Sequence, residues 1–447
     1  MRMLQDTEIP TREQAAKEEM ACTSVSSIAA CILTAVFVAV LFAVPVIERL
    51  DDARCRAHGL APSPVAADYG LVAALRSAAD VYRASEGDGW GSLWAANRTL
   101  MQEFKRVEEN IETGSWLVRW IQPHAQYVMT RRLGAGNRQV YPGRYGWLFY
   151  RPDVDYVTGR GFLDPATLRR RQAEFSDSDG PVQADPVPAI LDFDRQLRSR
   201  GIRLIVMPVP AKPSIYPYRL HAAWGTSRPM PDNPSYEPFV RRLLQSGILV
   251  FDSRRAIHRV KGEESYLRSD THWRPETVER VAGDLAQKIR ETGLLPERET
   301  MEYRRDTLRL SGQGDTARLL RLPAYQRRYP LEAVELSQVR TPDGRLWNAS
   351  PEADILILGD SYANYFSLPG LGWGGGAGLV EQVSFHLQRP VDRITMNDQG
   401  AHTTRRELAR LVSGGVDRLN GKRVVVWEFA VRELATGHWP VITLDPE

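Results

Sequence analysis

The sequence has few cysteines and little charge imbalance. Its 447 residues suggest two or three domains and include only three cysteines, Cys22, Cys31 and Cys55. The first two lie beside or within an apolar run, so disulfides and a structural zinc cluster are excluded from the rest of the chain. The 58 Lys and Arg residues are scattered among 55 Asp and Glu residues. No basic stripe is present to bind nucleic acid, so we expect no DNA or RNA partner.

One long uncharged segment stands out from this ordinary globular composition. Residues 28–47 supply 20 mostly apolar positions, enough at about 1.5 Å per residue to cross a hydrocarbon layer of about 30 Å. A buried core helix would seldom be uncharged for so long. A cleaved signal peptide has a shorter apolar region and a basic start. The sequence therefore predicts an uncleaved transmembrane signal anchor at 28–47, after a tail at 1–27.

The basic residues around this segment do not settle its orientation. Three precede it and three follow it, which is a tie under the positive-inside rule: Arg2, Arg12 and Lys17, then Arg49, Arg54 and Arg56. Residues 48–68 are polar and contain two prolines, which is typical of a linker.

Residues 69–139 show helical periodicity. Apolar residues recur at spacings of three and four, first around Leu71 and Leu75 and again around Leu100 and Phe104. We expect a helical layer that packs on the domain that follows it. A coiled-coil seam is the alternative, although three glycines between residues 87 and 91 interrupt the run.

From residue 140 onward, short β-branched runs alternate with amphipathic segments. The runs have the composition of strands buried on both faces of a parallel sheet, and they lie at 203–209, 248–252, 354–359, 393–396 and 424–429. The amphipathic segments fall between them, at 189–200, 236–245, 275–292 and 403–412. This alternation predicts a doubly wound α/β domain with a mostly parallel sheet over residues 140–447.

A Gly-Asp-Ser triplet follows one of these strands. In such sheets functional groups gather at the carboxyl ends of the strands, where helix N-termini direct their N–H groups. Gly359 permits a tight turn, and the hydroxyl of Ser361 beside unpaired backbone donors is a candidate nucleophile. The alternative is that Asp360 or Ser361 is an ordinary helix N-cap.

A serine nucleophile requires a base and a group that orients the base. Among the eight histidines, His272 has Asp270 two residues before it, a spacing that lets the carboxylate bond to the imidazole. One alternative is that Asp270 caps the helix beginning near Pro275. Another is half of a metal site, but the sequence shows no cluster to complete the ligand set, so no metal is expected.

These motifs together resemble a known family. GDS at 359–361, with SDTHW at 269–273 upstream, looks like the circularly permuted SGNH-hydrolase-like domain of the alginate O-acetyltransferase family, the J- and X-type proteins. Ordinary members of the SGNH superfamily place the serine before the Asp-x-His pair, whereas in this sequence it follows the pair, which resembles the permuted order. Four more stretches match, at 145–159, 201–217, 379–392 and 424–434.

The resemblance implies a role for each of these residues. Ser361 would be the nucleophile, His272 the general acid and base, and Asp270 its orienting carboxylate. For the oxyanion hole, the backbone N–H of Ser361 is one donor, and the glycine-rich stretch 370–378 could supply a second. The resemblance offers Asn397 as the counterpart of the asparagine usual in the superfamily, although a polar loop after a strand has the same composition.

Other residues near the serine are candidates for substrate contacts. Tyr362 and Trp373 are flat aromatics on which sugar rings could pack, and core packing is their alternative role. Arg432 either pairs with a carboxylate at the site or braces the C-terminal helix.

The function implied by the resemblance is O-acetylation of an exported, alginate-like polysaccharide through an acyl-serine, without a cofactor. A multi-spanning membrane acyltransferase would pass the acetyl group across the bacterial inner membrane, which places the catalytic domain in the periplasm. An acetylesterase would use the same residues with water as acceptor, and a non-catalytic scaffold for polysaccharide biosynthesis is a further alternative. Since no carbohydrate-binding module follows the domain in this sequence, we expect the anchored J-type architecture.

Overall fold

The computed structural model describes residues 26–58, 71–84, 89–114, 116–176, 180–224, 231–258, 264–397 and 400–444. The chain divides into two compact units, residues 1–123 and 124–447. Residues 1–25 of the predicted tail and residues 59–68 of the predicted linker lie outside the described residues.

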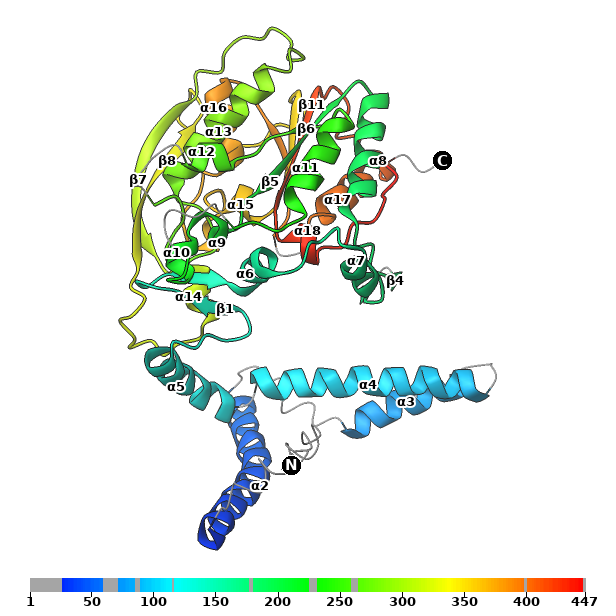
Figure 1. Ribbon diagram of the computed structural model, residues 1–447, viewed down its shortest axis with the longest axis vertical. Helices are drawn as coiled ribbons and strands as arrows, with labels where there is room; N and C mark the ends of the chain where they lie inside the picture. Colours follow the sequence, from blue (N-terminus) through cyan, green and yellow to red (C-terminus); the bar gives the residue numbers. More distant parts are fainter. Residues whose placement is uncertain are drawn as a thin grey trace, which may run out of the picture. The chain divides into compact units, whose positions relative to one another are not determined.

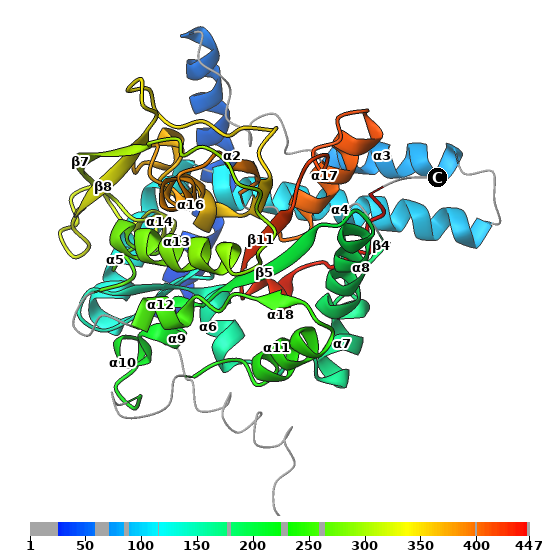
Figure 2. The same ribbon diagram turned by 90° about the horizontal axis from the view of Figure 1, so that it is seen from above.

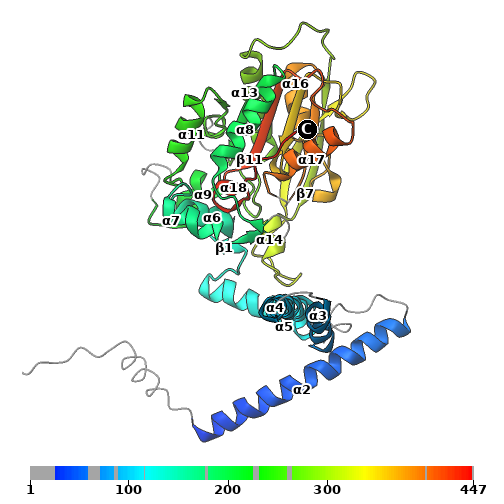
Figure 3. The same cartoon turned by 90° about the vertical axis from the view of Figure 1, so that its right-hand side faces the viewer.

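The described part of the first unit is helical. It contains α2 (Ser27–Ala57), α3 (Leu71–Ala84), α4 (Gly89–Gly114) and the first turns of α5 (Trp116–Leu133). The helices α3 and α4 lie side by side (Figures 1 and 3). The stretch in which apolar periodicity predicts helices thus contains three of them, and its packing on the next domain stays a prediction.

The predicted anchor segment lies within α2. This helix begins after Ser26, whose Oγ accepts a hydrogen bond from the backbone N–H of Ala29 (3.2 Å). It continues beyond residue 47 to Ala57, so the first part of the predicted linker is helical. In the portion of the chain described here, no helix meets both the length and the apolarity needed to cross a membrane. The spanning helix at 28–47 therefore stays a prediction.

The boundary between the two units falls inside α5, earlier than the predicted boundary at 139/140. The last turns of α5 bond to the segment that leads into the second unit. Thr130 Oγ1 and Gln126 Nε2 both donate to the carbonyl of Ala135 (2.8 and 3.2 Å). These bonds explain why the end of the helix belongs to the second unit.

The second unit is built on a five-stranded parallel sheet, which confirms the predicted fold class. The strand order is β10-β9-β11-β5-β6, and the strands are β5 (Arg203–Val209), β6 (Leu249–Val250), β9 (Ile355–Gly359), β10 (Asp392–Thr395) and β11 (Val424–Ala430). In the middle of the sheet, Val424 pairs with Arg203 on one side and with Ile355 on the other. All residues of β9 and β11 are buried, because both faces of these strands are covered.

Helices cover both faces of this sheet (Figure 2). One face packs against α12 (Arg254–His258), α13 (Pro275–Arg290) and α16 (Leu379–Leu387). The other packs against α8 (Pro186–Ser199), α11 (Tyr236–Gln245) and α17 (Thr403–Ser413). Successive strand residues alternate between the two cores: Ile205 and Met207 join the first, and Leu204 and Val206 the second.

Antiparallel hairpins and short helices complete the unit. The hairpins are β1 (Val140–Pro142) with β2 (Leu148–Tyr150), β3 (Phe175–Ser176) with β4 (Gly180–Pro181), and β7 (Arg304–Gly312) with β8 (Glu332–Arg340). The short helices are α6 (Arg151–Thr158), α7 (Pro165–Gln172), α9 (Lys212–Ile215), α10 (Pro217–Leu220), α14 (Asp315–Leu319), α15 (Ser361–Asn364), α18 (Glu433–Thr436) and the 3-10 helix η1 (Pro369–Leu371).

Candidate active site

Ser361 lies at the carboxyl end of β9, at the first residue of α15. The N-cap of α15 is Asp360, whose Oδ1 accepts from the backbone N–H of Tyr362 (2.8 Å). Its Oδ2 accepts from the backbone N–H of Ala430 on β11 (2.8 Å). Because Asp360 performs the capping, the hydroxyl of Ser361 is left for another contact.

The turn before Ser361 is tight and requires a glycine. A Cβ on Gly359 would lie 2.7 Å from the Cβ of Ala363 and 2.8 Å from Oε2 of Glu428. The carboxyl group of Glu428 lies beneath this turn and accepts from the backbone N–H of Asp360 (2.9 Å). Burial raises the pKa of Glu428 well above its usual range. A buried carboxyl group and a glycine therefore shape the turn that presents the serine.

Asp270 and His272 lie in the loop closed by an isolated bridge between Tyr266 and Trp273. This loop leads directly into α13, whose N-cap is Arg274 without a side-chain capping bond. The suggestion that Asp270 caps α13 is therefore wrong.

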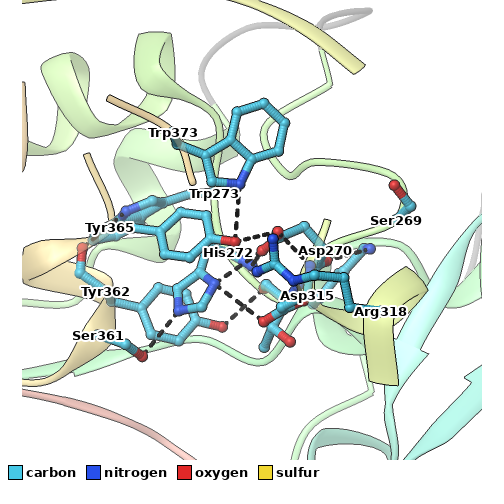
Figure 4. Close-up of polar contacts among 12 residues, drawn as sticks. Ser269, Asp270, His272, Trp273, Asp315, Arg318, Ser361, Tyr362, Tyr365 and Trp373 are labelled. Atoms are coloured by element: carbon cyan, nitrogen blue, oxygen red, sulfur yellow. Dashed lines mark hydrogen bonds and ion pairs between the residues drawn. The ribbon is translucent and has the colours of Figure 1, made fainter. Parts of the chain in front are cut away.

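The structure brings the three predicted catalytic residues into one chain of hydrogen bonds (Figure 4). His272 Nδ1 lies 2.9 Å from Asp270 Oδ1, and His272 Nε2 lies 2.9 Å from Ser361 Oγ. Because an ionised carboxylate can only accept, Nδ1 carries a hydrogen. In the neutral imidazole, Nε2 can then accept the proton of the serine hydroxyl.

A second carboxylate, Asp315 on α14, also faces the imidazole. Its Oδ2 lies 3.4 Å from His272 Nδ1, and its Oδ1 accepts from the backbone N–H of Thr271 (2.7 Å). Its own backbone N–H donates to Asp270 Oδ2 (2.8 Å). Sequence reasoning missed Asp315, because its only local signal is the preceding glycine, which does not connect it with the Asp-x-His motif.

The two carboxylates control the titration of His272. Burial by itself would lower the pKa of the imidazole, but the hydrogen bonds and negative charges of Asp270 and Asp315 raise it to about 9. Burial would raise the pKa of Asp315, but its interactions with His272 and Thr271 lower it. The imidazolium is therefore favoured at neutral pH, and the population of the neutral imidazole increases as the pH rises.

Aromatic side chains pack against the imidazole ring of His272. Tyr365 stacks on His272 with ring centroids 3.6 Å apart, donates its hydroxyl hydrogen to Asp270 and accepts from Trp373 Nε1 (3.0 Å). The hydroxyl of Tyr362 donates to the carbonyl of Thr271 (3.0 Å).

Tyr362 and Trp373 do not occupy the positions that sugar stacking would require. Their side chains are 1% and 0% exposed, and neither lines the cavity above the serine. Their surroundings instead match the alternative expected from the sequence, which is packing in the core.

Lys212 supports the loop from the inside, and sequence reasoning did not single it out. Its fully buried Nζ donates to the carbonyls of Leu148 (2.6 Å), Arg268 (2.9 Å) and Asp270 (2.8 Å). Burial lowers its pKa to about 8. The residue lies in the stretch 201–217 that carries part of the family resemblance, but no charge pattern distinguishes it there.

A cavity of about 570 Å³ opens over Ser361 and His272. Arg432, at the N-cap of α18, lies in its wall, and its Nη1 is 3.2 Å from Asp153 Oδ1. Burial would lower the pKa of Arg432, but the charge of Asp153 raises it. Asp153 does not line the cavity, and the carbonyl of Arg432 also accepts from the backbone N–H of Ala435 in α18 (2.9 Å), so both roles expected for Arg432 stay predictions.

Two further oxyanion candidates lie away from this cavity. Asn397 does not line it, and its Oδ1 accepts from Asn364 Nδ2 (3.2 Å). No residue of the stretch 370–378, all of which is described, lines it either. The carbonyl of Gly376 accepts from the backbone N–H of Val339 on β8 (2.7 Å). The glycine-rich stretch therefore packs on the β7–β8 hairpin, and its role as a second oxyanion donor stays a prediction.

Asp270, His272 and Asp315 also bring potential metal-ligand atoms within 4.8 Å of one another, among the residues that the structure describes. However, the imidazole Nδ1 and both oxygens of Asp270 already take part in hydrogen bonds. We therefore describe the group as a hydrogen-bonded relay and assign no metal to it.

The sequence matches one family model over most of the second unit. Residues 140–431 match the family described as the SGNH hydrolase-like domain of the acetyltransferase AlgX. Among curated proteins, the chain is 27% identical over 249 residues to the probable alginate O-acetylase AlgJ of Pseudomonas aeruginosa. It is 26% identical over 260 residues to the protein of the same description in Pseudomonas fluorescens. These alignments cover 54% and 55% of this chain, and the chain spans 61% of the length of each relative.

Solved structures of similar proteins are also known. The O-acetyltransferase domain of Pseudomonas putida AlgJ superposes with a TM-score of 0.49 and 21% identity, covering 66% of this chain and 92% of that domain. Pseudomonas aeruginosa AlgX superposes with a TM-score of 0.44 and 17% identity, covering 65% of this chain and 61% of AlgX.

Proposed function

Because the chain belongs to the SGNH hydrolase-like family of the acetyltransferase AlgX, we propose that it transfers acetyl groups to hydroxyls of an exported, alginate-like polysaccharide. The observation that carries this proposal is the hydrogen-bonded series from Asp270 through His272 to Ser361 at the edge of a cavity. The name of the AlgJ relatives, alginate O-acetylase, supports the choice of substrate.

In the first half of the proposed reaction, His272 Nε2 takes the hydroxyl proton of Ser361 as Oγ attacks the acetyl carbonyl. Asp270 accepts the Nδ1 hydrogen bond and stabilises the imidazolium. The backbone N–H of Ser361 is the oxyanion donor in this proposal. When the carbonyl bond re-forms, the bond to the donor's leaving group breaks, and the imidazolium returns its proton to that group.

In the second half, a sugar hydroxyl enters the cavity and attacks the acetyl group on Ser361. His272 Nε2 takes the proton of that hydroxyl, and the serine oxygen leaves with a proton from the imidazolium. The cavity of about 570 Å³ is large enough to admit a sugar residue beside the serine. Arg432, paired with Asp153, lies in its wall together with Arg318 and Arg321.

The location in the cell is part of the same proposal. An exported polysaccharide would meet the catalytic unit in the periplasm, with the chain held at the inner membrane by the segment 28–47. Exposed apolar side chains of α2, among them Ile32, Val36 and Phe37, support this anchor. The acetyl donor would then be a multi-spanning membrane acyltransferase. Phosphatase and β-galactosidase fusions after Pro64 test the topology, and an active cytoplasmic reporter there contradicts it.

The activity is tested with the purified full-length protein, an activated acetyl ester and an oligosaccharide acceptor. We expect acetylated sugar from the wild type and roughly a thousandfold or greater loss in Ser361→Ala, because the covalent intermediate cannot form. Ser246→Ala is the matched control, since Ser246 is exposed and bonds only locally to the carbonyl of Arg242. Release of acetate without acetylated sugar would identify an esterase. Folded Ser361→Ala with near-normal transfer would contradict the mechanism.

A further inference from the structure

Two loops approach each other closely next to His272. A Cβ on Gly314 would lie 2.0 Å from the carbonyl oxygen of Ser269 and 2.8 Å from the backbone nitrogen of Asp270. Only glycine allows this approach. It lets the backbone N–H groups of Asp315 and Ala317 donate to Asp270 Oδ2 (2.8 Å) and to the carbonyl of Ser269 (3.1 Å). The first turn of α14 is therefore fixed on the loop that carries the proposed base.

These bonds between α14 and the loop place the side chain of Asp315 next to the imidazole of His272. Its Oδ1 accepts from the backbone N–H of Thr271 (2.7 Å), which leaves Oδ2 at 3.4 Å from His272 Nδ1 (Figure 4). Asp270 is 0% exposed, whereas the side chain of Asp315 is 22% exposed and lines the cavity. One carboxylate thus reaches the ring from inside the protein and the other from the cavity wall.

The remaining charged and titratable groups around His272 do not duplicate this role. Tyr362 and Tyr365 pack against the ring from α15 and the residue after it, and burial raises the pKa of both hydroxyls. Asp153 from α6 is paired with Arg432, so its charge is largely balanced. Lys212 from α9 donates to the backbone carbonyl of Asp270, and its positive charge disfavours the imidazolium, which is the opposite of the role proposed for Asp315. Of the carboxylates near His272, only Asp270 and Asp315 approach its ring within 4 Å in the described part of the chain.

We propose that Asp315 is a positioning residue of the acyl transfer: together with Asp270 it stabilises the imidazolium that forms when His272 takes the proton of Ser361. This inference rests on the proposed function of the Ser361–His272 pair. An opposite charge within about 4–6 Å favours the charged form of a titrating group by about one to three pH units. Removing the charge of Asp315 should therefore let His272 lose its proton at a lower pH.

The test is the pH dependence of Ser361 sulfonylation by phenylmethanesulfonyl fluoride, measured on the full-length protein by mass spectrometry. In this reaction Ser361 Oγ forms a bond to sulfur, the S–F bond breaks, fluoride leaves, and His272 takes the hydroxyl proton and releases it to water. The reaction needs the basic form of His272 but neither an acetyl donor nor a polysaccharide. The wild-type rate should rise with pH, with a midpoint near 9.

The decisive variant is Asp315→Asn, which keeps an oxygen to accept from Thr271 and loses the charge. Its midpoint should fall by at least about one pH unit. Asp315→Glu, which keeps the charge, should stay near the wild type. The control Asp343→Asn should match the wild type as well, since Asp343 is an exposed turn residue that bonds to Thr341 and Arg345.

Each result separates the two proposals. An unchanged midpoint in folded Asp315→Asn overturns the role of Asp315 and leaves the proposed function intact. Absence of an adduct on wild-type Ser361 overturns the proposed function itself. If Asp315→Asn does not fold, Asp315→Ser, which also keeps an acceptor without charge, replaces it. A wild-type midpoint at or below about 6.5, the ordinary histidine value, overturns the inference whichever variants fold.

Discussion

Asp270 bonds to His272, and Asp360 directly precedes Ser361, so the two aspartates flank the hydrogen bond between His272 and Ser361. Their carboxylate groups have different partners. The carboxylate of Asp360 accepts from two fixed backbone N–H groups and lies beside the buried carboxyl group of Glu428. Asp270 also accepts from backbone N–H groups, but one of its partners is the imidazole Nδ1, whose charge changes in the proposed reaction. One carboxylate therefore maintains a turn, whereas the other also responds to a proton transfer.

The difference separates substitutions that should reduce activity from those that should reduce stability. A carboxylate that caps a helix and holds a turn stabilises the fold, and its loss lowers the free energy of unfolding. A carboxylate that accepts from the imidazole sets the tautomer of the base, and its loss removes the base from the correct orientation.

The largest effect is expected for Asp270→Asn. The amide offers one acceptor oxygen in place of two, so its NH2 group must face either His272 or the donors from Asp315 and Tyr365. We expect acetyl transfer to fall about 10⁴-fold through the wrong tautomer. The free energy of unfolding should also fall by about 1–3 kcal/mol, because a buried donor is left without an acceptor. Acetyl transfer and thermal unfolding are measured on the same preparation.

The control for this substitution is again Asp343→Asn, the same chemical change on an exposed turn, which should alter neither quantity. Normal transfer by Asp270→Asn would show that the carboxylate only holds the start of α14 and the loop, and the triad role would be abandoned.

A smaller loss of activity is expected for Asp360→Asn. The amide can keep one of the two backbone bonds, to Tyr362 or to Ala430, and loses the other. We expect the free energy of unfolding to fall by about 1 kcal/mol. Activity should fall no more than about tenfold, because the imidazole keeps its own partners. A loss near that of Asp270→Asn in a folded protein would show that Asp360 takes part in the chemistry.

The parallel sheet could be predicted from sequence, but the β7–β8 hairpin could not. The predicted strand 203–209 coincides with β5, because a strand buried on both faces is an uninterrupted apolar run. In contrast, β7 is mostly exposed and rich in arginine, so its sequence carries no such signal. The glycine-rich stretch 370–378 is a related case. Its composition suits an oxyanion loop, and only the packing on β8 shows its structural use.

The residues of the candidate site also differ in whether the sequence identifies them. Ser361, His272 and Asp270 could be found because each belongs to a short motif with its own chemistry. Asp315 and Lys212 could not, because their roles depend on contacts with Asp270 across 45 and 58 residues. Close approaches of this kind are set by the fold, and a single sequence does not show them.

The smallest effect is expected at a third carboxyl group, Glu428, which lies beneath the turn at Gly359 and Asp360. It is 1% exposed and accepts from the backbone N–H of Asp360 (2.9 Å). Burial is the main cause of its raised pKa, and the nearby charge of Asp360 adds to it. Glu428 should therefore be neutral at the pH of the reaction.

Glu428→Gln replaces a neutral acid with a neutral amide of nearly the same shape, so acetyl transfer should change by less than about twofold. Above pH 4.5, the ordinary value, the unfolded wild-type chain releases a proton that the folded protein keeps. Each pH unit up to the folded pKa then lowers wild-type stability by as much as about 1.4 kcal/mol. Since glutamine does not titrate, the melting temperature of Glu428→Gln relative to the wild type should rise between pH 5 and pH 8 in a series of thermal scans.

Glu335→Gln, at an exposed glutamate on β8, should show no such trend. A Glu428→Gln protein that is less stable by a constant amount across this range would mean that Glu428 is ionised in the folded state, and that the turn under Ser361 is held by a charge like that of Asp360.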